Sequence, residues 1–362
     1  MTEPVPDTRW RFGRAPLVLR RVAAAMAAAA MLSGCAAAAP RLVPPFDVTE
    51  QRRIHGRELP PFQSCPNPPE PPEWFERPSF YTDPAFSVLD PRLHAEAMAR
   101  VAPLRGFGRG AAELSDAYVR DRRADPARAA CALDWLADWA ARNALVSGVA
   151  KWSNSDRAWF VIVNASVSLM KIDGAPGLDP EKLALVRGWL RRLTEDLVAR
   201  TDRNLESTRG TDRYPNNHSL WTAAAAVTAG IATGDRPLFA RGVVDLRVGL
   251  EAVDDKGFLP AEMQRRGRAL SYLQWAAQPL AIGLLHAQAN GEQLLDVNDR
   301  AFARFMAAVA RATRDPAIVE QATGEPQEPG AAAPPHHLLP PIPPTHPPHH
   351  PPPIKTLHPQ PK

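Results

Sequence analysis

Apolar residues recur at helical spacing from about residue 90 to residue 313 of this 362-residue chain. Within 126–145, for example, Leu133, Leu136 and Ala140 lie three and four positions apart, so they share one face of a helix. The same spacing predicts further helices at 155–172, 179–200, 217–233, 237–253, 266–290 and 297–313. No stretch alternates as strands do, and no strict repeat appears. The pattern therefore predicts an all-α domain: a bundle, a superhelix or an α/α toroid.

Two proline-rich stretches interrupt this pattern. Because proline removes a backbone donor and clashes with the preceding turn, residues 36–85 are expected to be loop and extended chain. Residues 329–362 are rich in proline and histidine and lack periodicity, so they are expected to form a disordered tail. The segment between them, 86–328, is the predicted folded domain. A metal site is the less favoured interpretation of the closely spaced tail histidines, His346, His349 and His350.

Residues 1–35 are predicted to be a signal peptide with a lipobox-like end. Arginines precede an apolar run, Val22 to Leu32, that is too short to span a bilayer and is typical of a secretory signal. The run ends in Leu32-Ser33-Gly34-Cys35, which resembles the lipobox of bacterial lipoproteins. We therefore expect export to the periplasm, with anchoring in the outer membrane through lipidated Cys35. The alternative is a plain signal peptide cleaved within 36–39.

Cysteine content and charge indicate the redox compartment of the protein and the kind of partner it binds. Export leaves Cys65 and Cys131, and two cysteines in an oxidising compartment commonly pair. We expect a disulfide that ties the proline-rich segment to a helix, rather than two unpaired buried thiols. The net charge of only +4 and the lack of a nucleic-acid-binding motif do not suggest nucleic acid as a partner, and the modest basic balance would suit an anionic substrate. No metal-ligand set stands out in the folded segment, and no cofactor is expected.

The first candidate for chemistry is the segment from Tyr214 to Trp221, which opens an alanine-rich helix. It places Asn217 and His218 in the first turn, where unpaired N–H groups and a partial positive charge attract carboxylates. The same field disfavours an imidazolium, so His218 would stay neutral and able to accept a proton. The alternative is structural: Asn216 caps the helix and His218 only covers its end.

The second candidate is the pair Arg265 and Tyr272, seven positions apart. On a continuous helix that is two turns, so both would lie on one face. An arginine facing a tyrosine would favour the phenolate or polarise the phenol. The alternative is an amphipathic helix with solvated arginines and a tyrosine in the core.

Together these segments resemble the alginate (mannuronate) lyases of polysaccharide lyase family five. The similarity runs from Ser64 to about Glu328. Its matching pieces are Ser64-Cys65-Pro66, Ala130-Cys131-Ala132-Leu133, Asn216-Asn217-His218-Ser219, Gly257-Phe258-Leu259-Pro260, Arg265-Arg266 with Arg268-Ala269-Leu270 and Tyr272, and Ala287-Gln288-Ala289-Asn290-Gly291. The resemblance implies an incomplete α/α toroid with a central cleft, acting as a monomer on an anionic polysaccharide.

The resemblance also implies β-elimination of a 4-O-linked uronate, which gives 4,5-unsaturated ends. Asn217 and Arg265 would neutralise the substrate carboxylate, so that the C5 proton becomes acidic. Tyr272 would be the acid that protonates the leaving oxygen, and either Tyr272 or His218 would be the base. By the same resemblance, substrate-binding residues are expected at Arg268, Trp221 and Tyr81.

The chain departs from the family pattern at several positions. Phe80 stands where the family commonly has a cleft lysine, Leu273 replaces a histidine after Tyr272, and the tail replaces a C-terminal segment with tryptophan, tyrosine and cysteines. These changes motivate a second hypothesis, a non-catalytic lipoprotein that binds an exopolysaccharide. A third, a glycoside hydrolase, would need two facing carboxylates, and Glu262 and Asp254 are not convincingly paired in the sequence.

Overall fold

The computed structural model describes residues 40–72, 79–83, 88–146 and 158–328. Within these ranges the regular structure is helical, with isolated β-bridges but no strand, which confirms the all-α prediction. The predicted signal segment with Cys35 and the predicted tail with its histidines lie outside the described residues. The expectations for them therefore stay predictions.

The described helices belong to one compact unit that begins at Leu42. In chain order they are α2 (Val48–His55), α3 (Pro91–Arg120), α4 (Pro126–Ala141), α5 (Ala158–Ile172), α6 (Pro180–Leu205), α7 (Asn217–Thr233), α8 (Arg236–Glu251), α9 (Pro260–Met263), α10 (Ala269–Ala289), α11 (Val297–Arg314) and α12 (Ala317–Thr323), with short 3-10 turns η2 (Glu206–Thr208) and η3 (Arg266–Arg268). Among these helices, none combines the length and the apolar character that crossing a membrane requires.

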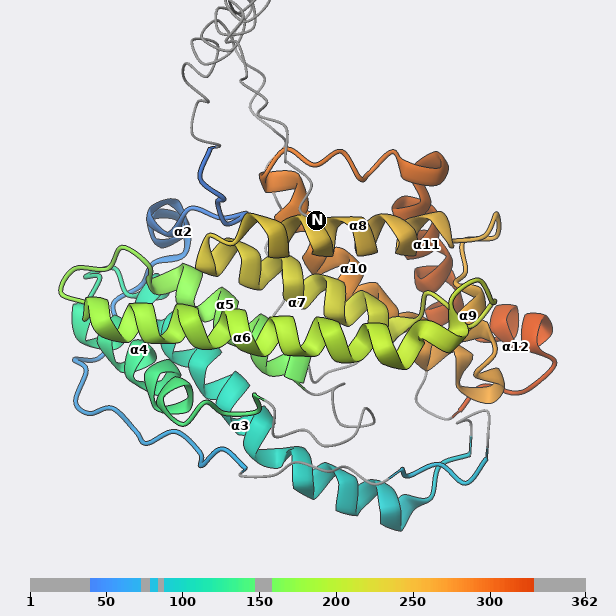
Figure 1. Ribbon diagram of the computed structural model, residues 1–362, viewed down its shortest axis with the longest axis horizontal. Helices are drawn as coiled ribbons and strands as arrows, with labels where there is room; N and C mark the ends of the chain where they lie inside the picture. Colours follow the sequence, from blue (N-terminus) through green and yellow to red (C-terminus); the bar gives the residue numbers. More distant parts are fainter. Residues whose placement is uncertain (1–39, 73–78, 84–87, 147–157, 329–362) are drawn as a thin grey trace, which may run out of the picture. The chain divides into compact units, whose positions relative to one another are not determined.

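The long helices form two layers. Helices α3, α5, α7 and α10 contact one another in turn and make the inner layer, while α4, α6, α8 and α11 pack outside them. Helix α7 lies between α6 and α8 in Figure 1 and also contacts α5 and α10. Its residues from Ser219 to Ala232 are buried, because an alanine-rich helix lets neighbours approach from every side. The first turn of α7 is thereby fixed at the end of the inner layer.

Aspartate and proline together start several of the helices. Asp90, Asp125, Asp179 and Asp235 are the N-cap residues of α3, α4, α6 and α8, and each accepts a hydrogen bond from a first-turn backbone N–H. A proline follows at the first or second helical position in all four, where its missing N–H costs nothing. Because these aspartates and prolines are visible in the sequence, the starts of these helices are predictable.

Two glycines allow α7 and α8 to pack closely. A Cβ on Gly230 would lie 2.6 Å from the backbone nitrogen of Phe239, and one on Gly242 would lie 2.7 Å from the carbonyl oxygen of Ala223. Any side chain at either position would push the two helices apart. The α7–α8 hairpin is therefore rigid behind the N-terminus of α7.

The expectation of loop and extended chain for residues 36–85 is wrong at one place. Val48–His55 forms α2, which lies in a window without proline. Asp47 caps it by accepting hydrogen bonds from the backbone N–H groups of Thr49 and Glu50. Proline density around a segment does not prevent a short helix inside it when the segment brings its own cap.

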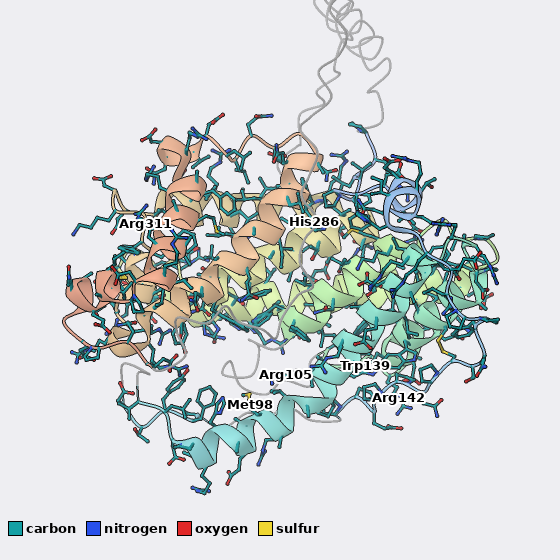
Figure 2. All side chains as sticks on the ribbon, turned by 180° about the vertical axis from the view of Figure 1, so that it is seen from behind. Met98, Arg105, Trp139, Arg142, His286 and Arg311 are labelled. Carbon is teal, nitrogen blue, oxygen red and sulfur yellow. A yellow bond between two sulfur atoms is a disulfide. The ribbon has the colours of Figure 1, made fainter. Side chains whose placement is uncertain are left out.

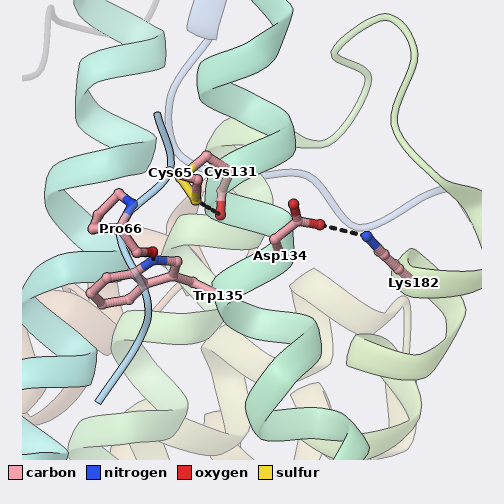
Figure 3. The surroundings of a disulfide bond; sticks show 6 residues. All are labelled: Cys65, Pro66, Cys131, Asp134, Trp135 and Lys182. Atoms are coloured by element: carbon pink, nitrogen blue, oxygen red, sulfur yellow. Dashed lines mark hydrogen bonds and ion pairs between the residues drawn. A yellow bond between two sulfur atoms is a disulfide. The ribbon is translucent and has the colours of Figure 1, made fainter. Parts of the chain in front are cut away.

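The expected disulfide is present. Cys65 and Cys131 are bonded and tie the proline-rich segment to α4, as Figure 3 shows. Beside the bond, the indole N–H groups of Trp135 and Trp139 donate to the carbonyl oxygens of Pro66 (2.6 Å) and Pro69 (2.8 Å). The bond and these two donors hold the extended chain flat against the helix.

Helix α10 carries a histidine in its buried interior. His286, labelled in Figure 2, is 5% exposed, and its Nδ1 lies 2.8 Å from the carbonyl oxygen of Ile282. Burial disfavours the charged imidazolium and lowers the pKa of His286 to about 4. This histidine is neutral at physiological pH.

Candidate active site

The N-terminus of α7 is built by a capping box. The side-chain oxygen of Asn216 accepts hydrogen bonds from the backbone N–H groups of His218 (3.0 Å) and Ser219 (3.4 Å), and Ser219 Oγ accepts one from the Asn216 N–H. Asn216 is therefore the cap, and Asn217 and His218 are the first two helical residues. The structural and chemical interpretations of this segment apply to neighbouring residues and do not exclude each other. The side chain of His218 is half-buried.

Asn217 is held by the buried carboxylate of Glu262, which the sequence suggested only as a candidate for a hydrolase. Glu262 of α9 has no exposed surface, and one of its oxygens accepts the backbone N–H of Asn217 at 2.5 Å. Asn217 Nδ2 lies 3.0 and 3.1 Å from the two Glu262 oxygens. Burial raises the pKa of Glu262, while Arg265 and the Asn217 donors oppose that rise. Glu262 thus fixes the orientation of the Asn217 amide.

Arg265 and Tyr272 meet as expected, but by a different path. The predicted continuous helix 266–290 is wrong at its start, because the chain makes the turn η3 with Arg266 in the left-handed region (φ 51°) and α10 begins only at Ala269. The turn still brings the Arg265 guanidinium to 4.7 Å from the centre of the Tyr272 ring. Arg265 Nε also lies 4.0 Å from a Glu262 oxygen. Arg265 therefore stands between the tyrosine and the carboxylate that holds Asn217.

Tyr272 is joined to Tyr81 and Arg268. The two tyrosine hydroxyl oxygens lie 2.6 Å apart, and Arg268 Nη1 donates to Tyr81 Oη at 2.7 Å. The Arg268 guanidinium lies 5.2 and 5.7 Å from the centres of the Tyr81 and Tyr272 rings. Tyr81 and Arg268 were expected to bind substrate, which stays a prediction; the structure places the Tyr81 hydroxyl against that of Tyr272 and the Arg268 guanidinium beside the Tyr272 ring. Phe80, next to Tyr81, is buried against His94 with 5.0 Å between ring centres.

The surroundings of Tyr272 indicate its charge state. Removal from water, and then the neighbouring hydroxyl of Tyr81, raise the pKa of the Tyr272 phenol well above its usual value, while Arg265 and Arg268 oppose this rise with a smaller effect. Of the two states that the sequence left open for Tyr272 beside Arg265, a phenolate or a polarised phenol, the structure favours the phenol. Tyr272 is a protonated phenol at neutral pH, as an acid must be before it acts.

Trp221 does not line the site in this structure. Its side chain is 2% exposed and stacks on Trp159, with 4.1 Å between ring centres and 16° between planes. The substrate-binding role expected for Trp221 does not fit this burial, because a ring in the core has no face left for a ligand. Trp275 of α10 packs against both rings at 5.5 Å and is only partly buried.

The carboxylates do not form the pair that a glycoside hydrolase requires. Glu262 is engaged by Asn217, and Asp254 accepts the backbone N–H of Phe258 at 2.7 Å in the turn before α9. Neither faces a second carboxylate among the contacts of the described residues. The geometry instead combines one buried donor amide, two guanidinium groups and a protonated phenol.

The sequence matches a family model and individual relatives. A family model described as alginate lyase matches residues 79–319. A polysaccharide lyase of Stenotrophomonas maltophilia is 32% identical over 74% of this chain and 78% of its own length. An alginate lyase of Pseudomonas fluorescens is 34% identical over 58% of this chain and 56% of its own length.

Solved structures share the architecture. Alginate lyase A1-III from Sphingomonas species A1 matches with a TM-score of 0.64 and 21% identity, covering 80% of this chain and 84% of that one. An alginate lyase A1-III variant complexed with a tetrasaccharide matches with a TM-score of 0.68 and 22% identity, covering 79% of this chain and 81% of the other. At this identity the likeness establishes the fold, which is the α/α toroid expected from the sequence.

Proposed function

Because the chain belongs to the alginate lyase family, we propose that it is a polysaccharide lyase that cleaves mannuronate-rich alginate, or a related polyuronate, by β-elimination. One observation carries the assignment: the Tyr272 ring lies beside two guanidinium groups and its hydroxyl is held by Tyr81, near a helix N-terminus that begins with Asn217. That combination serves an elimination next to a carboxylate better than it serves hydrolysis.

Charge neutralisation is the first task of such a site. The proton on C5 of a uronate is weakly acidic, because the adjacent carboxylate already carries the charge that deprotonation would spread onto it. Arg265 supplies positive charge and donors, and the dipole of α7 adds positive potential beside Asn217, although the first-turn N–H groups are already bonded within the protein. Glu262 holds the Asn217 amide in place, so little reorganisation is needed when the carboxylate arrives.

Proton transfer is the second task. A base removes the C5 proton, the C4–C5 double bond forms, the C4–O4 bond breaks and the leaving oxygen takes a proton from Tyr272. Arg268 can only donate to Tyr81, so Tyr81 can donate to Tyr272 and leave the Tyr272 proton for the substrate oxygen. For a mannuronate unit the proton and the leaving group lie on one side, so Tyr272 can also serve as the base once deprotonated, and His218 is the other candidate.

The proposal extends to the location of the enzyme. The disulfide between Cys65 and Cys131 supports folding in an oxidising compartment, which agrees with the export signal expected in residues 1–35. Lipidation of Cys35 would hold the enzyme at the outer membrane. Mass spectrometry of the mature N-terminus distinguishes a lipidated Cys35 from cleavage further along.

The test of the activity is incubation with polymannuronate, polyguluronate and other polyuronates, while the ultraviolet absorbance of the new C4–C5 double bond is followed. We expect the absorbance to rise fastest with polymannuronate. No rise with any polyuronate would refute the lyase assignment. In that case, binding without product would favour the exopolysaccharide-binding alternative, and reducing ends without a double bond would favour a hydrolase.

A further inference from the structure

A short segment after α12 is bound to the turn that carries the site arginines. We call residues 326–328 the C-terminal strap. The backbone N–H of Glu328 donates to the carbonyl oxygen of Gly267 at 2.8 Å, and a Cβ on Gly267 would lie 3.0 Å from the carbonyl oxygen of Pro326. Gln327 donates from Nε2 to the carbonyl oxygen of Arg266 at 3.0 Å. The backbones of the strap and of the turn η3 therefore lie directly against each other.

The strap also caps α10. Arg268, the N-cap residue of this helix, provides no side-chain acceptor for the first-turn N–H groups. The side-chain oxygen of Gln327 accepts the backbone N–H of Leu270 at 2.9 Å in its place. Gln327 is itself fixed to α12, because its backbone N–H donates to Glu320 at 3.0 Å. The helix that carries Tyr272 thus begins on a cap supplied by the strap.

Glu328 holds one side of the Arg268 guanidinium. Its carboxylate oxygens lie 2.8 Å from Arg268 Nε and 3.1 Å from Nη2, and it also accepts the hydroxyl of Ser271. The Arg268 and Glu328 side chains are 16% and 28% exposed, so water competes little for this contact. A guanidinium is a rigid planar fork, and fixing Nε and Nη2 also fixes the direction of Nη1. Nη1 is the atom that donates to Tyr81.

Resting on the proposed function, we propose that Glu328 is a positioning residue for the proton-transfer pair: it holds Arg268, and Arg268 holds Tyr81 against Tyr272. Glu328 acts on the tyrosines through the Arg268 guanidinium, which it holds at one side while Nη1 reaches Tyr81 at the other. The strap thereby couples the segment after α12 to the geometry of the reacting phenol. Misplacing a reacting group by about 1 Å can reduce a rate about a hundredfold, so a support of this kind matters for turnover.

The chain offers a matched control for this idea. Glu325 immediately precedes the strap and pairs with Arg266 at 3.0 Å, but the two side chains are 40% and 62% exposed and neither contacts Arg268. Glu325→Gln therefore removes the same charge from the same part of the chain without touching the contact in question. An exposed ion pair of this kind contributes little to stability, because water and salt screen it.

The experiment compares full-length Glu328→Gln and Glu325→Gln on polymannuronate, with thermal unfolding measured in parallel. We expect Glu328→Gln to lower kcat by about tenfold to a hundredfold with little change in KM. Glu325→Gln should stay within about twofold of the wild type. Equal kcat values for the two variants would overturn the inference, as would a loss that follows thermal stability alone. A wild-type enzyme without activity would refute the proposed function and not the strap.

Two further measurements separate positioning from general support of the fold. In a Tyr81→Phe background, Glu328→Gln should cost less than about twofold, because the hydroxyl through which it acts is already gone. Full additivity of the two substitutions would contradict the chain of contacts. Independently of any substrate, hydrogen exchange of the peptide that contains Tyr81 should be faster in Glu328→Gln than in Glu325→Gln. Equal exchange in both would refute the positioning role even for an inactive protein.

Discussion

Replacing Glu262 tests whether its buried carboxylate supports the first turn of α7. The Glu262→Ala variant removes the acceptor for the backbone N–H and the Nδ2 of Asn217, whose side chain is only 2% exposed. Each buried donor that loses its acceptor costs roughly 1–3 kcal/mol. Removing a carboxylate that is costly to bury offsets part of this loss. We therefore expect Glu262→Ala to lower the free energy of unfolding by about 2–4 kcal/mol.

The Glu262→Gln variant is the informative partner of this substitution. One Glu262 oxygen accepts both the backbone N–H and the Nδ2 of Asn217, and the amide oxygen of glutamine can take its place without any turn of the Asn217 amide. Both Asn217 donors then keep an acceptor. The expected loss in the free energy of unfolding is below about 1 kcal/mol, because the volume and shape of glutamine are nearly those of glutamate.

The pH dependence adds a second observable. Burial raises the pKa of Glu262 above the value it has in the unfolded chain. The unfolded chain therefore ionises first as pH rises, and the stability of the wild type falls between the unfolded and the folded pKa of this group. Glu262→Gln cannot ionise, so this part of the pH dependence should be missing from it.

Urea denaturation of the wild type and both variants, at several pH values, is the assay. Equal midpoints for Glu262→Ala and Glu262→Gln would refute the reasoning, because hydrogen bonding to Asn217 would then contribute nothing. A wild-type stability that rises with pH relative to Glu262→Gln would contradict the direction of the pKa shift.

The other expected outcomes concern catalysis, the buried histidine and the disulfide. Tyr272→Phe should lower kcat by about two to four orders of magnitude, and Asn217→Ala by about a hundredfold or more, in the absorbance assay; wild-type turnover in Tyr272→Phe would remove its role. Because the pKa of His286 is about 4 in the folded protein against 6.5 as its ordinary value, stability should fall as pH drops from about 6.5 to 4, by up to roughly 3 kcal/mol. In His286→Gln this loss should disappear from denaturation curves. Replacing both Cys65 and Cys131 by serine should cost about 4 kcal/mol in the chain-entropy account of the closed loop, and an unchanged melting temperature would contradict it.

Local signals made the helices and part of the site predictable. Asp-Pro starts such as Asp179-Pro180 and the left-handed end of α7 at Gly234 act within one turn, so the sequence displays them directly. Arg265 and Tyr272 were expected to meet, and they do, although the intervening residues form a turn and not a helix. A left-handed Arg266 leaves no mark in a pattern of apolar spacing.

Long-range contacts could not be predicted in this way. Glu262 is a buried acid whose partner lies 45 residues earlier, and Glu328 meets Arg268 across 60 residues. A tryptophan such as Trp221 can line a cleft or pack in a core, and the sequence does not distinguish the two. The stacking of Trp221 on Trp159 places it in the core. The resemblance to a family supplied the site residues, while packing decided which of them contact one another.

The bond between Cys65 and Cys131 closes a covalent ring that contains Tyr81 and the whole of α3. A protease that cuts the main chain once inside this ring, on either side of Tyr81, produces two fragments that remain joined through sulfur. Such a molecule would migrate as one band without reductant and as two bands with it. The backbone next to Tyr81 can therefore be severed without either fragment leaving the protein, and a clipped, two-chain enzyme would keep every residue of the site attached.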